Sequence, residues 1–191
     1  MRGVLVGVLF GVMLGVGGAM LDTVFVLRTG RLSLGMLIVG ATWFLLNSGV
    51  VWGLLAFVAG RISRRAGIAA LAGVVSLVAA VGSYYCFGMT FGDRIWGLGP
   101  LLPVITRWTL AAVVLGALVG YLGALSRTPG RRAYIGIGTP VILALGALYL
   151  GWRDYGLNGT VIGANLFVVA ACLLACGIMI WRRERIHSVV E

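Results

Sequence analysis

The sequence predicts an all-α, polytopic integral membrane protein, built as one bundle of six transmembrane helices. Three observations lead to this fold class. Hydrophobic residues make up 61% of the 191 positions and charged residues only 10%, whereas soluble domains carry about 25% charged residues. Six apolar runs are each long enough to cross a bilayer, which takes about 20 residues. The basic residues gather in short clusters between these runs. We therefore expect a single transmembrane domain over residues 1–191.

The six apolar runs define the expected helices in order. They are residues 3–26, 34–59, 66–90, 103–125, 133–151 and 160–181, followed by a cytoplasmic tail, 182–191. We expect helices because a helix satisfies its backbone groups within one segment, and no run alternates polar and apolar residues as a membrane strand does. We interpret the first run as a helix, since it is long for the core of a signal peptide.

Small residues occupy one face of the first run. They recur at every fourth position: Gly3, Gly7, Gly11, Gly15 and Ala19. Asp22 shares this face, and bulky residues cover the opposite side, so we expect Asp22 at a helix junction. Small residues allow membrane helices to approach closely. Gly116 and Gly120 repeat the pattern in the fourth run. The partner of these faces is another helix of this chain, a second copy or a different subunit.

The distribution of arginine predicts the orientation. All 15 basic residues are arginine. Ten fall on the side of both termini: Arg2, Arg61, Arg64, Arg65, Arg127, Arg131, Arg132, Arg182, Arg183 and Arg185. Five fall on the other side: Arg28, Arg31, Arg94, Arg107 and Arg153. The richer side is expected to be cytoplasmic. We predict a bacterial inner-membrane protein with both termini inside. The clusters indicate topology, so no nucleic acid partner is expected despite the net charge of +10.

Carboxylates mark each outer connection. Asp22, Asp93 and Asp154 lie one per connection, each near an arginine in sequence. One interpretation is local charge compensation, since exposed ion pairs contribute at most about 1 kcal/mol. The other is a polar cavity between the outer helix ends, because charges at membrane depth usually face a bundle or a watery cavity.

Six residues are candidates for binding a ligand in such a cavity, chosen as polar or aromatic groups in apolar surroundings. They are Asp22, Asn47, Tyr85, Asp93, Arg107 and Asn165. For Asn47 and Asn165 the competing interpretation is helix packing, because asparagine in a span usually bonds to a neighbouring helix.

No catalytic, metal or cofactor site is predicted. The single histidine, His187, lies in the tail, and no zinc-protease, nucleophile-elbow or phosphate-loop sequence occurs. The three cysteines lie in apolar runs, where we expect small buried side chains rather than disulfides or metal ligands. An intramembrane enzyme is therefore the least favoured of the functional classes.

Three stretches carry a resemblance to a family. "LNSGVVWGLLAFVAGR", "AALAGVVSLVAAVGSYYCFG" and "GALVGYLGALSR" resemble an uncharacterised family of small bacterial six-helix membrane proteins, known as a domain of unknown function, over about residues 40–126. The resemblance implies the same architecture and no named activity. In length, topology and the small-residue face "GVLVGVLFGVMLG", the chain is also similar to substrate-binding subunits of energy-coupling-factor transporters.

Two functional hypotheses follow. The first is a transport-related protein that binds a polar solute or a lipid headgroup in an outward-facing cavity. The second is an accessory subunit without a ligand, which docks on a membrane protein partner or a second copy through the glycine face of the first helix. Both place the chain in the lipid bilayer.

Overall fold

The computed structural model describes residues 1–26, 42, 45–63, 65–91, 98–155 and 159–188. The described part is all-helical, as predicted. Its helices are α1 (Arg2–Val26), α3 (Gly49–Ile62), α4 (Ala66–Phe91), α5 (Leu98–Leu125), α6 (Arg132–Tyr155) and α7 (Gly159–Ser188). Five of these contain stretches long and apolar enough to cross a membrane: Arg2–Asp22, Ala66–Phe91, Leu101–Leu125, Arg132–Arg153 and Val161–Arg185.

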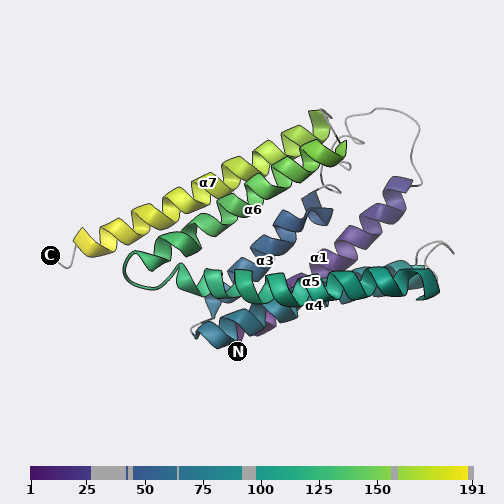
Figure 1. Cartoon of the computed structure of the whole chain (residues 1–191), viewed down its shortest axis with the longest axis horizontal. Helices are drawn as coiled ribbons and strands as arrows, with labels where there is room; N and C mark the ends of the chain where they lie inside the picture. Colours follow the sequence, from purple (N-terminus) through teal and green to yellow (C-terminus); the bar gives the residue numbers. More distant parts are fainter. Residues whose placement is uncertain (27–41, 43–44, 64, 92–97, 156–158, 189–191) are drawn as a thin grey trace.

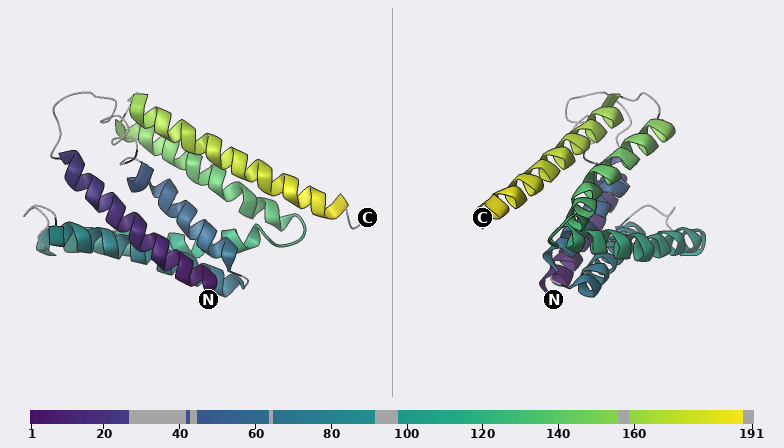
Figure 2. Two further views of the ribbon diagram at one scale, coloured as in Figure 1. Left: turned by 180° about the vertical axis from the view of Figure 1, so that it is seen from behind. Right: turned by 60° about the vertical axis from the view of Figure 1, so that its left-hand side comes forward.

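The short helix α3 lies at the centre of the fold. It contacts α1, α4, α5 and α6. Helices α1 and α5 both pack along α4, and α6 and α7 form a pair that diverges from α5 (Figures 1 and 2). A core cluster joins α3, α4 and α5 around Phe57, Leu77 and Val119, and a second joins α3 to the α6–α7 pair around Val50 and Ala144. The packing surfaces of four helices therefore converge on α3.

Glycines lie at the closest helix contacts. A Cβ added at Gly11 would overlap the backbone oxygen of Ser76 on α4, and Gly15 meets Ala80 of α4 in the same way. Between α4 and α5, Gly73 lies directly against the backbone of Gly116 and Gly120. Without side chains at these positions the backbones approach closely, and van der Waals packing replaces the hydrophobic drive that lipid does not supply.

Within its described residues, the expected span 34–59 is an interrupted helix rather than a continuous one. Residues 27–41 and 43–44 lie outside the described part. Residues 45–47 are helical, but Ser48 has extended backbone angles (φ −75°, ψ 134°), and α3 begins only at Gly49. The hydroxyl of Ser48 donates to the carbonyl of Leu45 at 2.9 Å. Serine and asparagine offer the backbone such local bonds in place of the helical ones, which explains a break within "NSG".

At the break, the carbonyl of Leu46 accepts its hydrogen bond from a side chain rather than from a backbone N–H of the helix. The indole Nε1 of Trp52 donates to this oxygen at 2.6 Å. Within a bilayer an unsatisfied carbonyl costs several kcal/mol, so broken helices require such a bond. Trp52 therefore stabilises the break from one turn inside α3.

Helix α5 starts at Leu98, earlier than the expected start at Pro103. Pro103 lies inside the helix, in its second turn. There it removes the bond to the carbonyl of Gly99, close to the helix end, and membrane helices tolerate proline because neighbouring groups satisfy the freed carbonyl. The expected boundary at Pro103 therefore lies about one turn after the start of α5.

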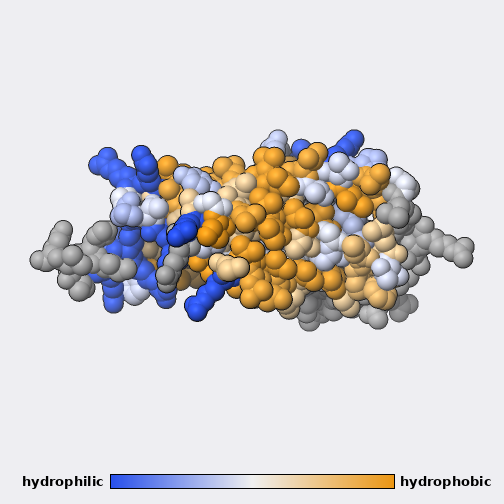
Figure 3. All heavy atoms as spheres, turned by 90° about the horizontal axis from the view of Figure 1, so that it is seen from below, coloured by the Kyte–Doolittle hydropathy of each residue, from blue (hydrophilic) through white to orange (hydrophobic). Residues whose placement is uncertain are grey.

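Three groups of arginines meet at one end of the molecule, which we call the basic end and define by Arg61, Arg127 and Arg183. Arg61 donates to the hydroxyl of Ser126, and Arg127 donates to the carbonyl of Arg61 at 2.9 Å. Arg183 donates to the carbonyls of Thr128 and Gly130 at 3.1 and 2.6 Å. In Figure 3 hydrophilic residues gather most densely at the end of the molecule near the C-terminus, beside a broad apolar band.

Candidate functional site

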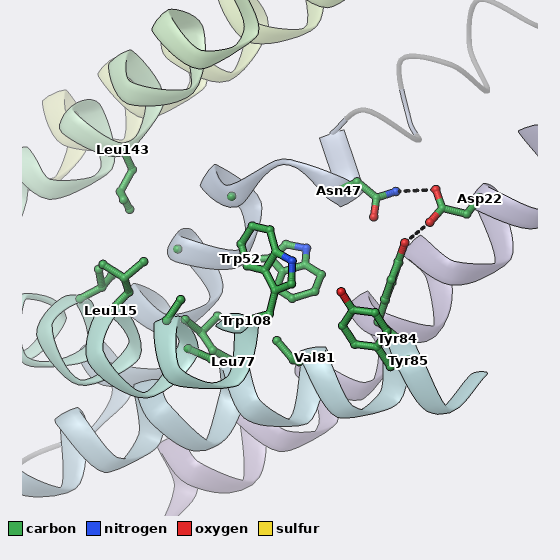
Figure 4. Close-up of a pocket in the computed structure, with 15 residues that line it drawn as sticks. Asp22, Asn47, Trp52, Leu77, Val81, Tyr84, Tyr85, Trp108, Leu115 and Leu143 are labelled. Carbon is green, nitrogen blue, oxygen red and sulfur yellow. Dashed lines mark hydrogen bonds between the residues drawn. The ribbon is translucent and has the colours of Figure 1, made fainter. Parts of the chain in front are cut away.

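A pocket of about 360 Å³ lies among α1, α3, α4, α5 and α6 (Figure 4). Ligand sites are usually concave and mostly apolar, with a few polar groups that fix orientation, and they start at about 300 Å³. This pocket has that composition, with one polar end and a long apolar remainder.

The polar end is built around Asp22, on the last turns of α1. Tyr84 of α4 donates its hydroxyl to Oδ2 of Asp22, and Asn47 donates its Nδ2 to Oδ1 at 3.4 Å. Figure 4 shows these side chains meeting from three segments of the chain. Both oxygens of the Asp22 carboxyl group thus accept hydrogen bonds from side chains of other segments. These bonds fix the position of the carboxyl group at one end of the pocket.

Close packing of α1 on α4 sets this geometry. A Cβ at Gly15 would overlap Ala80 and Ser83 of α4, and a Cβ at Gly18 would come within 3.2 Å of Oδ1 of Asn47. Asp22 follows on the same helix face, so the close approach upstream brings its carboxylate within reach of Tyr84. The close contact at the glycine face of α1 thus positions the polar end of the pocket.

Aromatic rings form the walls next to the polar end. The ring of Tyr84 stands edge-on to Tyr85 at 5.1 Å between centroids, and Trp52 lies 6.3 Å from Tyr84. Leu77 and Val81 of α4 and Leu143 of α6 continue the wall away from Asp22. Trp108 of α5 lines another side. Edge-to-face aromatic pairs contribute about 0.5–1.5 kcal/mol beyond their buried area, which favours a well-ordered wall.

The structure brings together three of the six predicted site residues. Asp22, Asn47 and Tyr85 all line the pocket. Arg107 does not line it, and its side chain is exposed on α5. Asp93 lies outside the described residues.

Asn165 is buried on α7, where a Cβ added at Gly151 of α6 would meet its amide nitrogen. It lies in the contact between α6 and α7 rather than in the pocket lining.

Among the lining residues that sequence reasoning missed, three are aromatic: Tyr84, Trp52 and Trp108. Tyr84 is the neighbour of the chosen Tyr85, and no signal in the sequence distinguishes the two, because the face of α4 that meets α1 is set by packing. The six tryptophans of the sequence occur mostly near the ends of the expected spans, a pattern typical of an interfacial aromatic belt rather than of a binding site. Both Trp52 and Trp108 line the pocket.

The predicted packing glycines lie within the fold. Gly3 lies against Ala59 and Ser63 at the end of α3, and Gly7 lies between Ala59 and Ser76. Gly116 and Gly120 lie against Gly73 and Ala69 of α4. The small-residue face of α1 is thus covered by α3 and α4 of the same chain.

Among the described residues, no three or more His, Cys, Asp or Glu side chains are grouped so as to hold a metal ion. Cys172 and Cys176 are buried free thiols of α7, and the thiol of Cys176 donates to the carbonyl of Ile137 at 2.8 Å. These cysteines contact α6 as packing side chains.

The apolar helices and the pocket between them define a class: an all-helical protein whose helices are compatible with a multi-pass arrangement in a lipid bilayer. The chain belongs to a family of unknown function (DUF6518), whose model matches residues 35–190. This match confirms the resemblance seen over residues 40–126 and extends it through α6 and α7. Asp22 and α1 precede the matched range. No curated protein matches the chain, and no solved structure does.

Proposed function

We propose that this chain is a bacterial inner-membrane protein with six spans and both termini in the cytoplasm. The meeting of Arg61, Arg127 and Arg183 at the basic end supports this orientation. Gly3, next to Arg2, lies against Ser63 at the same end, so all four arginine groups of the expected cytoplasmic side gather there. Arginine-rich connections stay on the cytoplasmic side.

Truncated fusions to a fluorescent protein and to alkaline phosphatase test this topology. We expect fluorescence after Arg65, Pro129 and Glu191, and phosphatase activity after Gly30 and Tyr155. The segment between Gly30 and Arg65 is decisive, because α3 alone has 14 residues and a span takes about 20. The same reporter active after both Gly30 and Arg65 would show that this segment does not cross.

We further propose that the protein binds a small molecule in the pocket as part of a transport-related role. The single observation that carries this proposal is a mostly apolar pocket that ends at the carboxylate of Asp22. The lining favours an amphipathic molecule over a strongly polar solute, because only one end offers hydrogen-bonding groups. A broken helix beside a pocket, as at Ser48, is a feature of membrane transporters.

Filling the pocket tests this proposal. Ala111 of α5 lines the pocket, and Ala171 is exposed on α7. We expect native mass spectrometry of gently extracted protein to detect a bound small molecule in the wild type and in Ala171→Phe. The same mass should be lost from Ala111→Phe, because the added ring occupies the cavity. A wild type without any bound molecule, or equal amounts in both variants, would contradict the proposal.

The alternative of an accessory subunit that docks through the glycine face of α1 is less well supported. Gly7, Gly11 and Gly15 are covered by α3 and α4. The exposed side of α1 carries bulky residues such as Leu5 and Met13. A partner would therefore meet this bulky side, which is also suited to lipid.

A further inference from the structure

We infer that the basic end holds the phosphate of an anionic phospholipid between Arg61 and Arg127. This end lies away from the polar end of the pocket, since Gly3 at the start of α1 packs there and Asp22 lies on the last turns of that helix. The inference therefore goes beyond the proposed function and does not depend on the pocket. It is carried by three features: two charges brought together, the donors they have left over, and the apolar surface beside them.

Glycine packing brings the two charges together where α3 and α5 end. A Cβ added at Gly60 of α3 would overlap the backbone of Gly120 of α5. Arg61 is the next residue after Gly60, and Arg127 lies in the turn that follows α5. The positive charge of Arg127 acts on that of Arg61 at this junction. The close approach of the two helices thus places two like charges side by side.

Within the described residues, both guanidinium groups bond to neutral oxygens. Arg61 donates to the hydroxyl of Ser126, and Arg127 donates to the carbonyl of Arg61 at 2.9 Å. A guanidinium group has five N–H donors, and each of these two groups uses one in the described part of the chain. Glu184, the described carboxylate at this end, is exposed on α7. An anion would therefore meet several remaining donors and relieve the repulsion between the two charges.

A phosphodiester at the membrane surface suits this pair. Arginine binds phosphate through two parallel N–H···O bonds, and basic sites between membrane helices bind anionic lipid headgroups. Val58 lies one turn before Arg61 on the same face of α3 and is 46% exposed. The basic end also borders the apolar band of the surface (Figure 3). A lipid would therefore place its phosphate at the arginines and its chains against apolar side chains, which a free phosphate ion lacks the chains to do.

Membrane topology explains the number of arginines at this end but not the pairing of these two. The positive-inside distribution requires arginines in the connections, and Arg131, exposed in the same connection as Arg127, meets that requirement equally well. Holding Arg61 beside Arg127 adds a Coulombic repulsion that topology does not require. Arg131 is therefore the matched control, because its loss changes the net charge by the same amount.

Native mass spectrometry of the full chain in detergent micelles measures the affinity for added phospholipid. The probes are dioleoyl phosphatidylglycerol, which is anionic, and dioleoyl phosphatidylcholine, which has the same chains and no net charge. We expect the wild type to bind phosphatidylglycerol at least about tenfold more tightly, the ratio that one charge-assisted hydrogen bond provides. Arg127→Gln should remove most of this preference, whereas Arg131→Gln should retain it. A difference between the two variants reports the position of the charge rather than the net charge.

Glycerophosphoglycerol, the headgroup of phosphatidylglycerol without its chains, tests the source of the phosphate. We expect it not to displace phosphatidylglycerol at equal concentration. Displacement at equal concentration would overturn the lipid and assign the pair to a free phosphate ester.

Three further outcomes would overturn the inference. Equal affinity of the wild type for the two lipids would exclude selection of an anion, and this comparison needs no variant to fold. Equal effects of Arg127→Gln and Arg131→Gln would show that the lipid responds to net charge alone. Loss of phosphatidylglycerol binding in Ala111→Phe would place the lipid in the pocket instead of at the basic end.

Discussion

Gly73→Ala is expected to prevent stable folding, although it adds a single methyl group. The new Cβ would overlap the carbonyl oxygen of Gly116 and lie 2.9 Å from the Cα of Gly120. Both are backbone atoms of α5, so no side-chain rotation relieves the contact and the two helices must separate. Overpacking a core typically costs about 1–3 kcal/mol. We expect a destabilisation at or above the upper end of that range, which is a large share of the roughly 5–15 kcal/mol by which proteins are stable.

Gly82→Ala is the matched control on the same helix. Nothing lies within 4 Å of a Cβ at this position, and alanine has the higher helix propensity. We expect Gly82→Ala to match or slightly exceed the wild type in melting temperature. Gly73→Ala should give a low yield of monodisperse protein in size-exclusion chromatography and a clearly lower melting temperature. Similar melting temperatures for the two variants would contradict the described approach of α4 and α5.

Gly11→Leu is expected to unfold the monomer, because α1 would be pushed away from α4. A Cβ at Gly11 would overlap the backbone oxygen of Ser76, and the rest of the leucine side chain has no free space along Ala79 and Ala80. Loss of this packing would also displace Asp22 from Tyr84, since both depend on the same helix contact. We expect aggregation on detergent extraction, measured as loss of the monodisperse peak.

Gly17→Leu serves as the control for Gly11→Leu. The nearest atom to a Cβ at Gly17 is Cδ1 of Leu46, at 3.7 Å, which is an ordinary contact with a flexible side chain. This variant should extract as the wild type does. The pair also separates the two functional hypotheses. A folded Gly11→Leu monomer that has lost a co-purifying protein would favour docking through α1 and contradict internal packing.

Much of the helical organisation could be predicted from composition and periodicity. The position of Asp22 on the glycine face of the first run follows from helical geometry, and the structure places it where α1 meets α4. The contact with Tyr84 could not be derived, because the relative rotation of two helices depends on their packing. Tyr84 and Tyr85 point in directions about 100° apart around α4. A rotation of α4 by one residue would therefore bring the other tyrosine ring to the carboxylate.

The break at Ser48 could not be read from the sequence for a different reason. Asparagine, serine and glycine within an apolar run are also compatible with an intact span, since small and polar residues are common in membrane helices. The bond from the side chain of Trp52 to the carbonyl of Leu46 cannot be read from local sequence. This bond satisfies the carbonyl at the break, as an apolar environment requires. Arg107 and Trp108 show a similar limit. Adjacent in sequence, they point to different surroundings, and only Trp108 lines the pocket.

The double role of Trp52 constrains how this pocket can be redesigned or diversified. Its ring is part of the cavity wall, and its indole nitrogen satisfies the backbone where the helix is interrupted. A substitution intended to reshape the wall at this position would also leave a polar oxygen without its partner. The wall is more freely altered from α5, where Ala111 and Leu115 border the cavity. Substitutions there can change the shape of the cavity while Trp52 keeps its bond to the carbonyl of Leu46.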